Sequence, residues 1–124
     1  MARSPAYEKF PGHSVEVAPK PGRVRVEFAG QTIAESTRSL ECLEGTYTPV
    51  VYVPREDVRA EFLEKTEQTS YCPFKGHASY YTIRVGERVS ENAVWSYEDP
   101  YDQVAALANC AAFYLDRIDA LVEE

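Results

Sequence analysis

The sequence predicts a mostly β domain of the α+β class, in which a small antiparallel sheet forms a cradle and one helix follows at the C-terminus. Apolar and polar residues alternate in short stretches between residues 23 and 97, and turn residues separate these stretches. After Pro100 the apolar spacing lengthens to three or four residues. Strands and helices do not alternate along the chain, so a doubly wound parallel sheet is not expected.

Residues 1–22 are expected to form an N-terminal arm ahead of a single β-rich domain at 23–124. The arm contains four prolines and two glycines, a composition that favours extended or irregular backbone. The aromatic side chains of Tyr7 and Phe10 would allow it to lie across the domain. An arm that frays into solvent is the alternative.

The first predicted hairpin covers residues 23–36. Apolar and charged side chains alternate over 23–28, Ala-Gly-Gln at 29–31 is a turn sequence, and a second strand follows at 32–36. Alternation of this kind is typical of a strand that buries one face.

Two further short strands are predicted at 39–44 and 50–53, the second of them fully apolar and ended by Pro54. The polar sequence at 54–57 then favours a turn, because proline presets φ and the acidic side chains accept hydrogen bonds from free backbone amides. A helix that begins there is the alternative, since two apolar residues four positions apart follow.

A second hairpin is predicted from a β-rich stretch at 79–85, a Gly-Glu-Arg turn at 86–88 and a returning strand at 89–97.

The C-terminal residues 100–122 are predicted to form an amphipathic helix. Asp99 would cap this helix and Pro100 would occupy its first turn. The apolar residues that recur every three or four positions are Val104, Leu107, Ala111, Leu115, Ile118 and Val122.

Charge and composition limit the partners. A formal net charge of −7 and a pI near 4.9 disfavour binding to phosphate backbones and anionic lipid, so neither nucleic acid nor a membrane is an expected partner. Three widely spaced cysteines suggest reduced thiols, and no stretch has the length and apolar character of a membrane span. A cytoplasmic protein is therefore expected, either monomeric or homodimeric.

The Cys-Pro-Phe-Lys-Gly-His sequence at 72–77 is a candidate reactive loop. Proline keeps Cys72 extended and the glycine permits positive φ, so thiol, ammonium and imidazole would lie close together. Lys75 or His77 would then favour the thiolate that a nucleophilic cysteine requires. The alternative is a buried, inert Cys72 beside a solvated Lys75.

Aromatic residues on the predicted strands are candidates for a stacking wall. Trp95 and Tyr97 lie two apart and share a face, and Tyr80 belongs to the preceding strand. Tyr52 lies on the strand at 50–53. Filling the core is the ordinary role of such residues and remains the alternative.

Charged residues at strand ends and turns could hold a polar or anionic group. Arg38 and Arg55 offer bidentate donors, Glu44 is a further candidate, and Asp57 could act as a general base. Exposed ion pairs are the alternative.

Several chemistries have no signature in the sequence. The two histidines are far apart, which disfavours a metal centre, and no cofactor is expected. Phosphate-binding, dinucleotide-binding and serine-hydrolase motifs are missing, as are paired acidic ligands beside a Gly-Ser turn.

The sequence resembles a small bacterial and fungal family catalogued as domain of unknown function four-two-seven, which carries a nominal nucleotidyltransferase label without an established activity. The similarity covers about residues 22 to 120 and is carried by Arg38 and by the motifs at 52–58, 69–76 and 91–97. The resemblance implies a β-tent-like cradle, some relatives of which bind ligands in an aromatic pocket and hold zinc through four cysteines. This chain has no Cys-x-x-Cys pair, so zinc is not carried over.

Three functions follow from these observations. The first is a cradle that binds an unknown small molecule through an aromatic and basic pocket. The second is a small enzyme with Cys72 as nucleophile, or with Lys75 and Asp57 as acid and base. The third is a protein-interaction module that uses the C-terminal helix. The predicted ligand-binding residues are Arg38, Glu44, Tyr52, Arg55, Asp57, Cys72, Lys75, His77, Tyr80, Trp95 and Tyr97.

Overall fold

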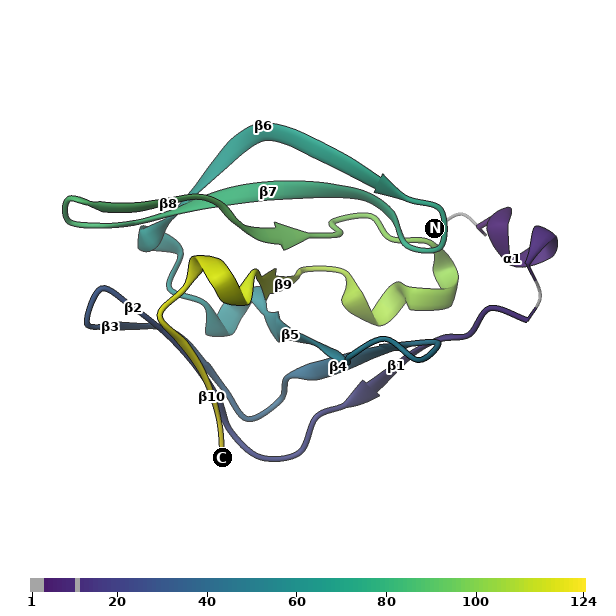
Figure 1. The fold of residues 1–124 in the computed structure, drawn as a ribbon, viewed down its shortest axis with the longest axis horizontal. Helices are drawn as coiled ribbons and strands as arrows, with labels where there is room; N and C mark the ends of the chain where they lie inside the picture. The colour runs from purple at the N-terminus through teal and green to yellow at the C-terminus, as the bar shows by residue number, and fades with distance from the viewer. Residues whose placement is uncertain (1–3, 11) are drawn as a thin grey trace.

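The computed structural model describes residues 4–10 and 12–124 and consists mainly of antiparallel strands joined by turns and short helical segments (Figure 1). Its strands are β1 (Val15–Pro19), β2 (Val24–Phe28), β3 (Gln31–Ser36), β4 (Leu40–Glu44), β5 (Val50–Pro54), β6 (Leu63–Cys72), β7 (Gly76–Val85), β8 (Arg88–Ser96), β9 (Cys110–Phe113) and β10 (Ala120–Glu123). The helical elements are α1 (Ala6–Lys9) and four 3₁₀ turns, η1 (Arg55–Asp57), η2 (Ala60–Phe62), η3 (Asp102–Leu107) and η4 (Leu115–Arg117). No helix in the described part of the chain has the length and apolar composition needed to cross a membrane.

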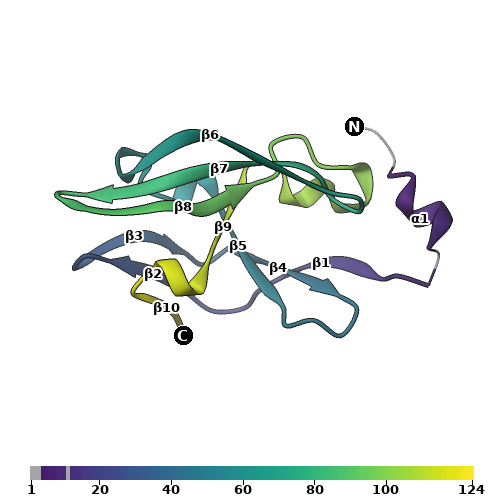
Figure 2. The ribbon, with the colours of Figure 1, turned by 45° about the horizontal axis from the view of Figure 1, so that its top comes forward.

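The strands form two sheets. The large sheet has the order β1-β4-β5-β9-β8-β7-β6, and the small sheet has the order β10-β2-β3. In both views the strands β6, β7 and β8 form an upper layer, and the small sheet and the β1–β4 pair lie side by side beneath it (Figures 1 and 2). Strands β5 and β9 cross between the layers (Figure 2). The large sheet is therefore strongly bent.

The first hairpin is confirmed. Strands β2 and β3 pair antiparallel from Val24↔Ser36 to Phe28↔Gln31, with one irregularity after Val26. The two connecting residues have positive φ, 52° at Ala29 and 76° at Gly30, as the tightest hairpin turns require.

The second hairpin is also confirmed, since β7 and β8 pair antiparallel across the predicted turn. The strand before it, β6, is not among the predicted elements. Its residues are mostly exposed, because β6 is an edge strand of the large sheet. A strand without an apolar face gives no period-two signal, which explains why the sequence pattern misses it.

The predicted C-terminal helix at 100–122 is wrong. This segment contains η3, β9, η4 and β10 instead, and Asn109 has a φ of 60°, which no helix interior contains. All four residues of β9 are buried, since the strand lies between β5 and β8. The apolar spacing that resembles a helical period comes from residues in several short elements. Val104 and Leu107 lie in η3, Ala111 in β9, Leu115 in η4, Ile118 just before β10 and Val122 in β10, and Leu115 is exposed. The possible helix after Pro54 is limited to the 3₁₀ turns η1 and η2.

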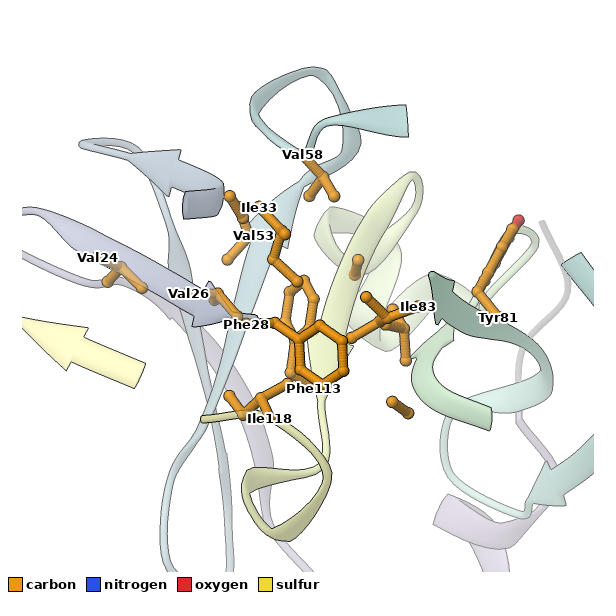
Figure 3. Packing of buried hydrophobic residues seen from close by; sticks show 14 residues of the cluster. Val24, Val26, Phe28, Ile33, Val53, Val58, Tyr81, Ile83, Phe113 and Ile118 are labelled. Atoms are coloured by element: carbon orange, nitrogen blue, oxygen red, sulfur yellow. The ribbon is translucent and has the colours of Figure 1, made fainter. Parts of the chain in front are cut away.

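The main core lies between the small sheet and the large sheet (Figure 3). Ile33 and Ile83 are completely buried, and Phe28, Tyr81 and Phe113 contribute aromatic rings. Full burial of an aliphatic side chain stabilises a fold by about 1.5–3 kcal/mol. Some strands contribute residues to this core and also to a second hydrophobic cluster. In β5, for example, Val53 belongs to the first cluster and the neighbouring Tyr52 to the second.

The N-terminal segment lies against the domain at several points. Val15–Pro19 pairs with β4, and the buried Ser4 donates a hydrogen bond from its hydroxyl to the carbonyl of Pro73. The Phe10 ring is 59% exposed and lies 6.4 Å from the ring of Phe74. The side chain of Tyr7, the other residue expected to dock the arm, lies outside the described residues.

Candidate functional site

The predicted tyrosines lie inside the second hydrophobic cluster. Tyr52, Tyr80 and Tyr97 are 2%, 7% and 7% exposed. The indole Nε1 of Trp95 donates a hydrogen bond to the Tyr52 hydroxyl at 3.1 Å, and the Tyr52 and Tyr97 rings are 6.5 Å apart. Burial raises the pKa of Tyr52 and of Tyr97 well above the usual range, so both phenols stay protonated. Three of the four predicted wall residues thus fill space.

An ion pair joins opposite ends of the large sheet. Glu44 ends β4 and Lys75 lies in the turn between β6 and β7, which are far apart in the strand order. Lys75 Nζ donates to Glu44 Oε1 at 2.5 Å, and His13 Nε2 lies 2.9 Å from Glu44 Oε2. We call Glu44 and Lys75 the cross-sheet ion pair. Both side chains are less than a quarter exposed.

The surroundings shift the pKa of each residue of this pair in the direction that favours its charged form. Burial raises the pKa of Glu44, but the hydrogen bonds from Lys75 and His13 lower it more, and the net direction is downward. Burial lowers the pKa of Lys75, but the hydrogen bond to Glu44 and the neighbouring thiols raise it more. Lys75 therefore stays an ammonium near neutral pH and is not itself a nucleophile.

Cys72 lies beside this pair. Its sulfur is 3.9 Å from Lys75 Nζ, the contact expected from their spacing in the sequence. His77, by contrast, is exposed and its ring lies 4.8 Å from Tyr71, so it belongs to a different surface.

Arg38 and Asp57 form a separate exposed group. The guanidinium of Arg38 donates to both oxygens of Asp57, at 3.0 Å each, and the Ser36 hydroxyl donates to the same carboxylate at 2.6 Å. The hydrogen bond from Arg38 lowers the pKa of Asp57. A carboxylate so fully bonded is a poor general base, because its proton affinity is reduced.

Arg55 belongs to a third group. Its guanidinium donates to the Tyr81 hydroxyl at 2.9 Å and lies 4.5 Å from the centre of the same ring. Tyr81 in turn donates to Glu98, which also binds Lys65 at 2.9 Å. The predicted cationic residues Arg38, Arg55 and Lys75 thus have separate partners: Arg38 and Lys75 form ion pairs, and Arg55 binds the neutral Tyr81 side chain.

A groove opens where the large sheet divides. Strands β5 and β9 pair only at Val53↔Ala111 and Pro54↔Cys110. Beyond this short contact the two strands separate: the rest of β5 pairs with β4, and the rest of β9 pairs with β8. The space between the diverging strands has a volume of about 550 Å³. Its lining residues are Thr48, Pro49, Val50, Val51, Trp95, Phe113, Tyr114, Leu115, Leu121 and Glu123, and we call this space the Trp95 groove.

Two of the three aromatic residues that line the groove are in ring contact with each other. Trp95 and Tyr114 are half-buried, with ring centres 4.5 Å apart and planes inclined at 46°. Trp95 is the one predicted site residue that lines the groove. Sequence reasoning did not identify Tyr114 and Leu121 as groove residues, because the sequence pattern assigns them to a helix. The aromatic side chain of Tyr114 is a signal that could have identified it.

The described residues contain no group of three or more histidine, cysteine or acidic side chains placed to hold a metal ion.

Comparison with known proteins bears on the family alone. A search of curated proteins finds no significant match. The family model described as "Domain of unknown function (DUF427)" matches residues 16–124, which is most of the chain and includes every strand from β2 onward. The chain therefore belongs to the DUF427 family.

Proposed function

We propose that this protein binds a small, flat, mostly apolar molecule in the Trp95 groove. The observation that carries the proposal is the divergence of β5 from β9, which leaves an opening lined by the aromatic rings of Trp95, Phe113 and Tyr114. Small-molecule sites are typically concave, mainly apolar and about 300–1,000 Å³ in volume, with a few polar groups that set orientation. A groove of about 550 Å³ lies inside that range.

The Trp95 ring is held in place for this role. Its Nε1 is satisfied by the Tyr52 hydroxyl, and Tyr52 itself is almost completely buried. A ring that does not have to be ordered on binding costs less conformational entropy, which favours affinity. Tyr52 would therefore act through Trp95, as a positioning residue.

The charge of the groove selects the ligand class. Among its described lining residues Glu123 is the one that carries charge; it is exposed and forms an ion pair with Lys20 at 3.3 Å. Arg38, Arg55 and Lys75 lie elsewhere, in ion pairs or hydrogen bonds of their own. A neutral or cationic ligand is thus favoured over an anionic one, in keeping with the net charge of −7.

We propose the fold type, the location and the oligomeric state of the protein on the same structural grounds. The bent antiparallel sheet supports a β-tent-like cradle, with the ligand at the line where the sheet bends. All three cysteines are free, which supports a reducing, cytoplasmic location. A monomer is sufficient for this function, because the lining residues all come from one chain.

Trp95 is the only tryptophan, so its fluorescence reports on the groove directly. Titration with the neutral, flat dye N-phenyl-1-naphthylamine is expected to quench Trp95 emission and to sensitise dye emission by energy transfer. Tyr114→Ala should weaken dye binding about tenfold, because an aromatic contact contributes about 0.5–1.5 kcal/mol beyond its buried area.

Tyr47→Ala is the matched control for this titration. Tyr47 lies in the loop before β5, is 72% exposed and does not line the groove. Its removal should change the dissociation constant less than twofold. Equal effects of the two substitutions, or dye binding without transfer from Trp95, would contradict the proposal.

A further inference from the structure

The hydrogen-bond pattern between β5 and β9 stops where the Trp95 groove begins. The last pair of residues on the groove side is Val53↔Ala111. Further from the groove, Arg55 N donates to the carbonyl of Asn109 at 2.8 Å. Because every second pair of an antiparallel ladder exchanges hydrogen bonds, Val53↔Ala111 is the next pair that does so.

The pair after that would join Val51 to Phe113, and it is not formed. The N–H and C=O of one strand residue point to the same side, and those of the next residue to the other side. Val51 therefore directs its main chain to the same side as Val53, toward the opening. Tyr114 N donates to the carbonyl of Ala93 in β8 at 2.9 Å, so the preceding Phe113 directs its main chain away from β8. Both Val51 and Phe113 line the groove.

Strand β10 adds a third open edge. It is the edge strand of the small sheet and pairs with β2 on one side. Glu124 and Arg23 exchange hydrogen bonds of 2.8 Å and 3.1 Å, so the alternate residues Leu121 and Glu123 direct their main chain away from β2. These two residues also line the groove. Three strands thus present main-chain donors and acceptors at its walls.

From this arrangement we propose that the ligand of the Trp95 groove is a short extended peptide, which enters the opening as an additional strand between β5 and β9. The inference rests on the proposed function, because it names the class of molecule that the same groove takes. An extended peptide carries N–H and C=O groups along both edges, so consecutive residues meet β5 and β9 in turn. Strand addition gains affinity from main-chain hydrogen bonds and specificity from pockets for alternate side chains.

The walls of the groove determine which peptide fits. The rings of Trp95 and Tyr114, with centres 4.5 Å apart, offer an apolar contact for an aromatic side chain. The one charged lining residue is Glu123, which binds Lys20 through Oε1 at 3.3 Å and is half exposed. A carboxylate here, in a chain of net charge −7, favours a peptide with a free amino group and disfavours one with a free carboxylate.

A peptide and its ester analogue test the main-chain hydrogen bonds. The peptide is valyl-phenylalanyl-valinamide, and in the analogue an ester oxygen replaces the N–H of phenylalanine. Both have the same side chains and a similar shape, but the ester has one donor fewer. In displacement of N-phenyl-1-naphthylamine from the wild-type protein, the peptide should bind about fivefold more tightly than the ester, the effect of one hydrogen bond. The peptide with a free C-terminal carboxylate should bind more weakly than the amide.

Val51→Pro tests the same hydrogen bonds from the side of the protein, with Val51→Ala as the matched control. Proline lacks the N–H and is tolerated where that group faces an open strand edge. Val51→Pro should bind the peptide about fivefold more weakly than Val51→Ala does, whereas the two variants should bind the dye about equally. Hydrogen exchange of the wild-type protein is the independent measurement should Val51→Pro fail to fold. Saturation with the peptide should slow exchange of the Val51 and Phe113 amides about tenfold.

Equal affinities for the peptide and the ester would overturn the inference. Equal peptide affinities of folded Val51→Pro and Val51→Ala, or unchanged exchange of both amides, would do the same. Each of these results is compatible with dye binding beside Trp95, so the proposed function would stand. Absence of energy transfer from Trp95 to the dye contradicts the proposed function instead, and the two claims are therefore distinguishable.

Discussion

Glu44 is the residue through which the two ends of the large sheet are joined. Its carboxylate accepts from Lys75 on one oxygen and contacts His13 on the other, so three segments distant in sequence meet at one side chain. The pair is partly shielded from water, which strengthens the attraction but also makes the loss of one partner costly.

Glu44→Gln is predicted to lower the free energy of unfolding at pH 7 by about 1.5–3 kcal/mol, the usual contribution of a hydrogen bond to a charged group. The pKa of Glu44 lies below its ordinary value of 4.5, so its contribution is present above that pH and is lost as pH falls through the lower, folded-state value. The pKa of Lys75 lies above 10.5, so its contribution is present below that pH and is lost as pH rises through the higher, folded-state value.

Urea denaturation of wild type and Glu44→Gln at a series of pH values checks this prediction. The quantity to compare is the difference in the free energy of unfolding between the two proteins. The difference should be largest between about pH 4.5 and pH 10.5 and should shrink on either side. Glu67→Gln is the control, because Glu67 is exposed and has no ion pair within the described residues. A difference that does not vary with pH would rule out an electrostatic role for Glu44.

At the scale of elements, the sequence predicts a strand well where one face of the strand is apolar and the other polar. It fails where the tertiary packing determines whether a segment forms a strand or a helix. The hairpin of β2 and β3 is predictable because alternation and its turn residues agree. Strand β9 is not, because its four residues, Cys-Ala-Ala-Phe, are all buried and a short, fully apolar run suits a buried helix segment equally well. The same error hides Tyr114 and Leu121, so Trp95 is the one groove residue that sequence reasoning identifies.

Asn109 offers a direct test of strand β9 against the helix. With a φ of 60° it occupies the left-handed region, in which glycine is unstrained and alanine is disfavoured by about 1–2 kcal/mol. Asn109→Gly is therefore predicted to leave stability unchanged or to raise it slightly, and Asn109→Ala to lower it by about 1 kcal/mol. A helix over 100–122 would give the opposite order in thermal or chemical denaturation, since alanine favours a helix interior and glycine does not.

At the scale of the whole molecule, the bend of the large sheet goes with two separate features, the Trp95 groove and the cross-sheet ion pair. On one side β5 and β9 diverge and leave the Trp95 groove, and at the other end the turn between β6 and β7 brings Cys72 and Lys75 to Glu44. The charged residues of β6, β7 and β8 are mostly engaged in local ion pairs, such as Arg84 with Glu64 at 2.6 Å. A ligand that binds at the apolar opening at the bend would thus stabilise this acidic molecule most, because it would remove apolar surface from water.

The most direct test of that conclusion is a nitrogen–proton correlation NMR titration of the ¹⁵N-labelled protein with N-phenyl-1-naphthylamine. The single indole resonance of Trp95 should shift in a saturable way, together with the backbone amides of Val51, Tyr114 and Leu121. Shifts confined to the exposed aromatic surface around Phe10 and Tyr71, with the Trp95 indole unchanged, would show that the dye binds elsewhere and would contradict the proposed function.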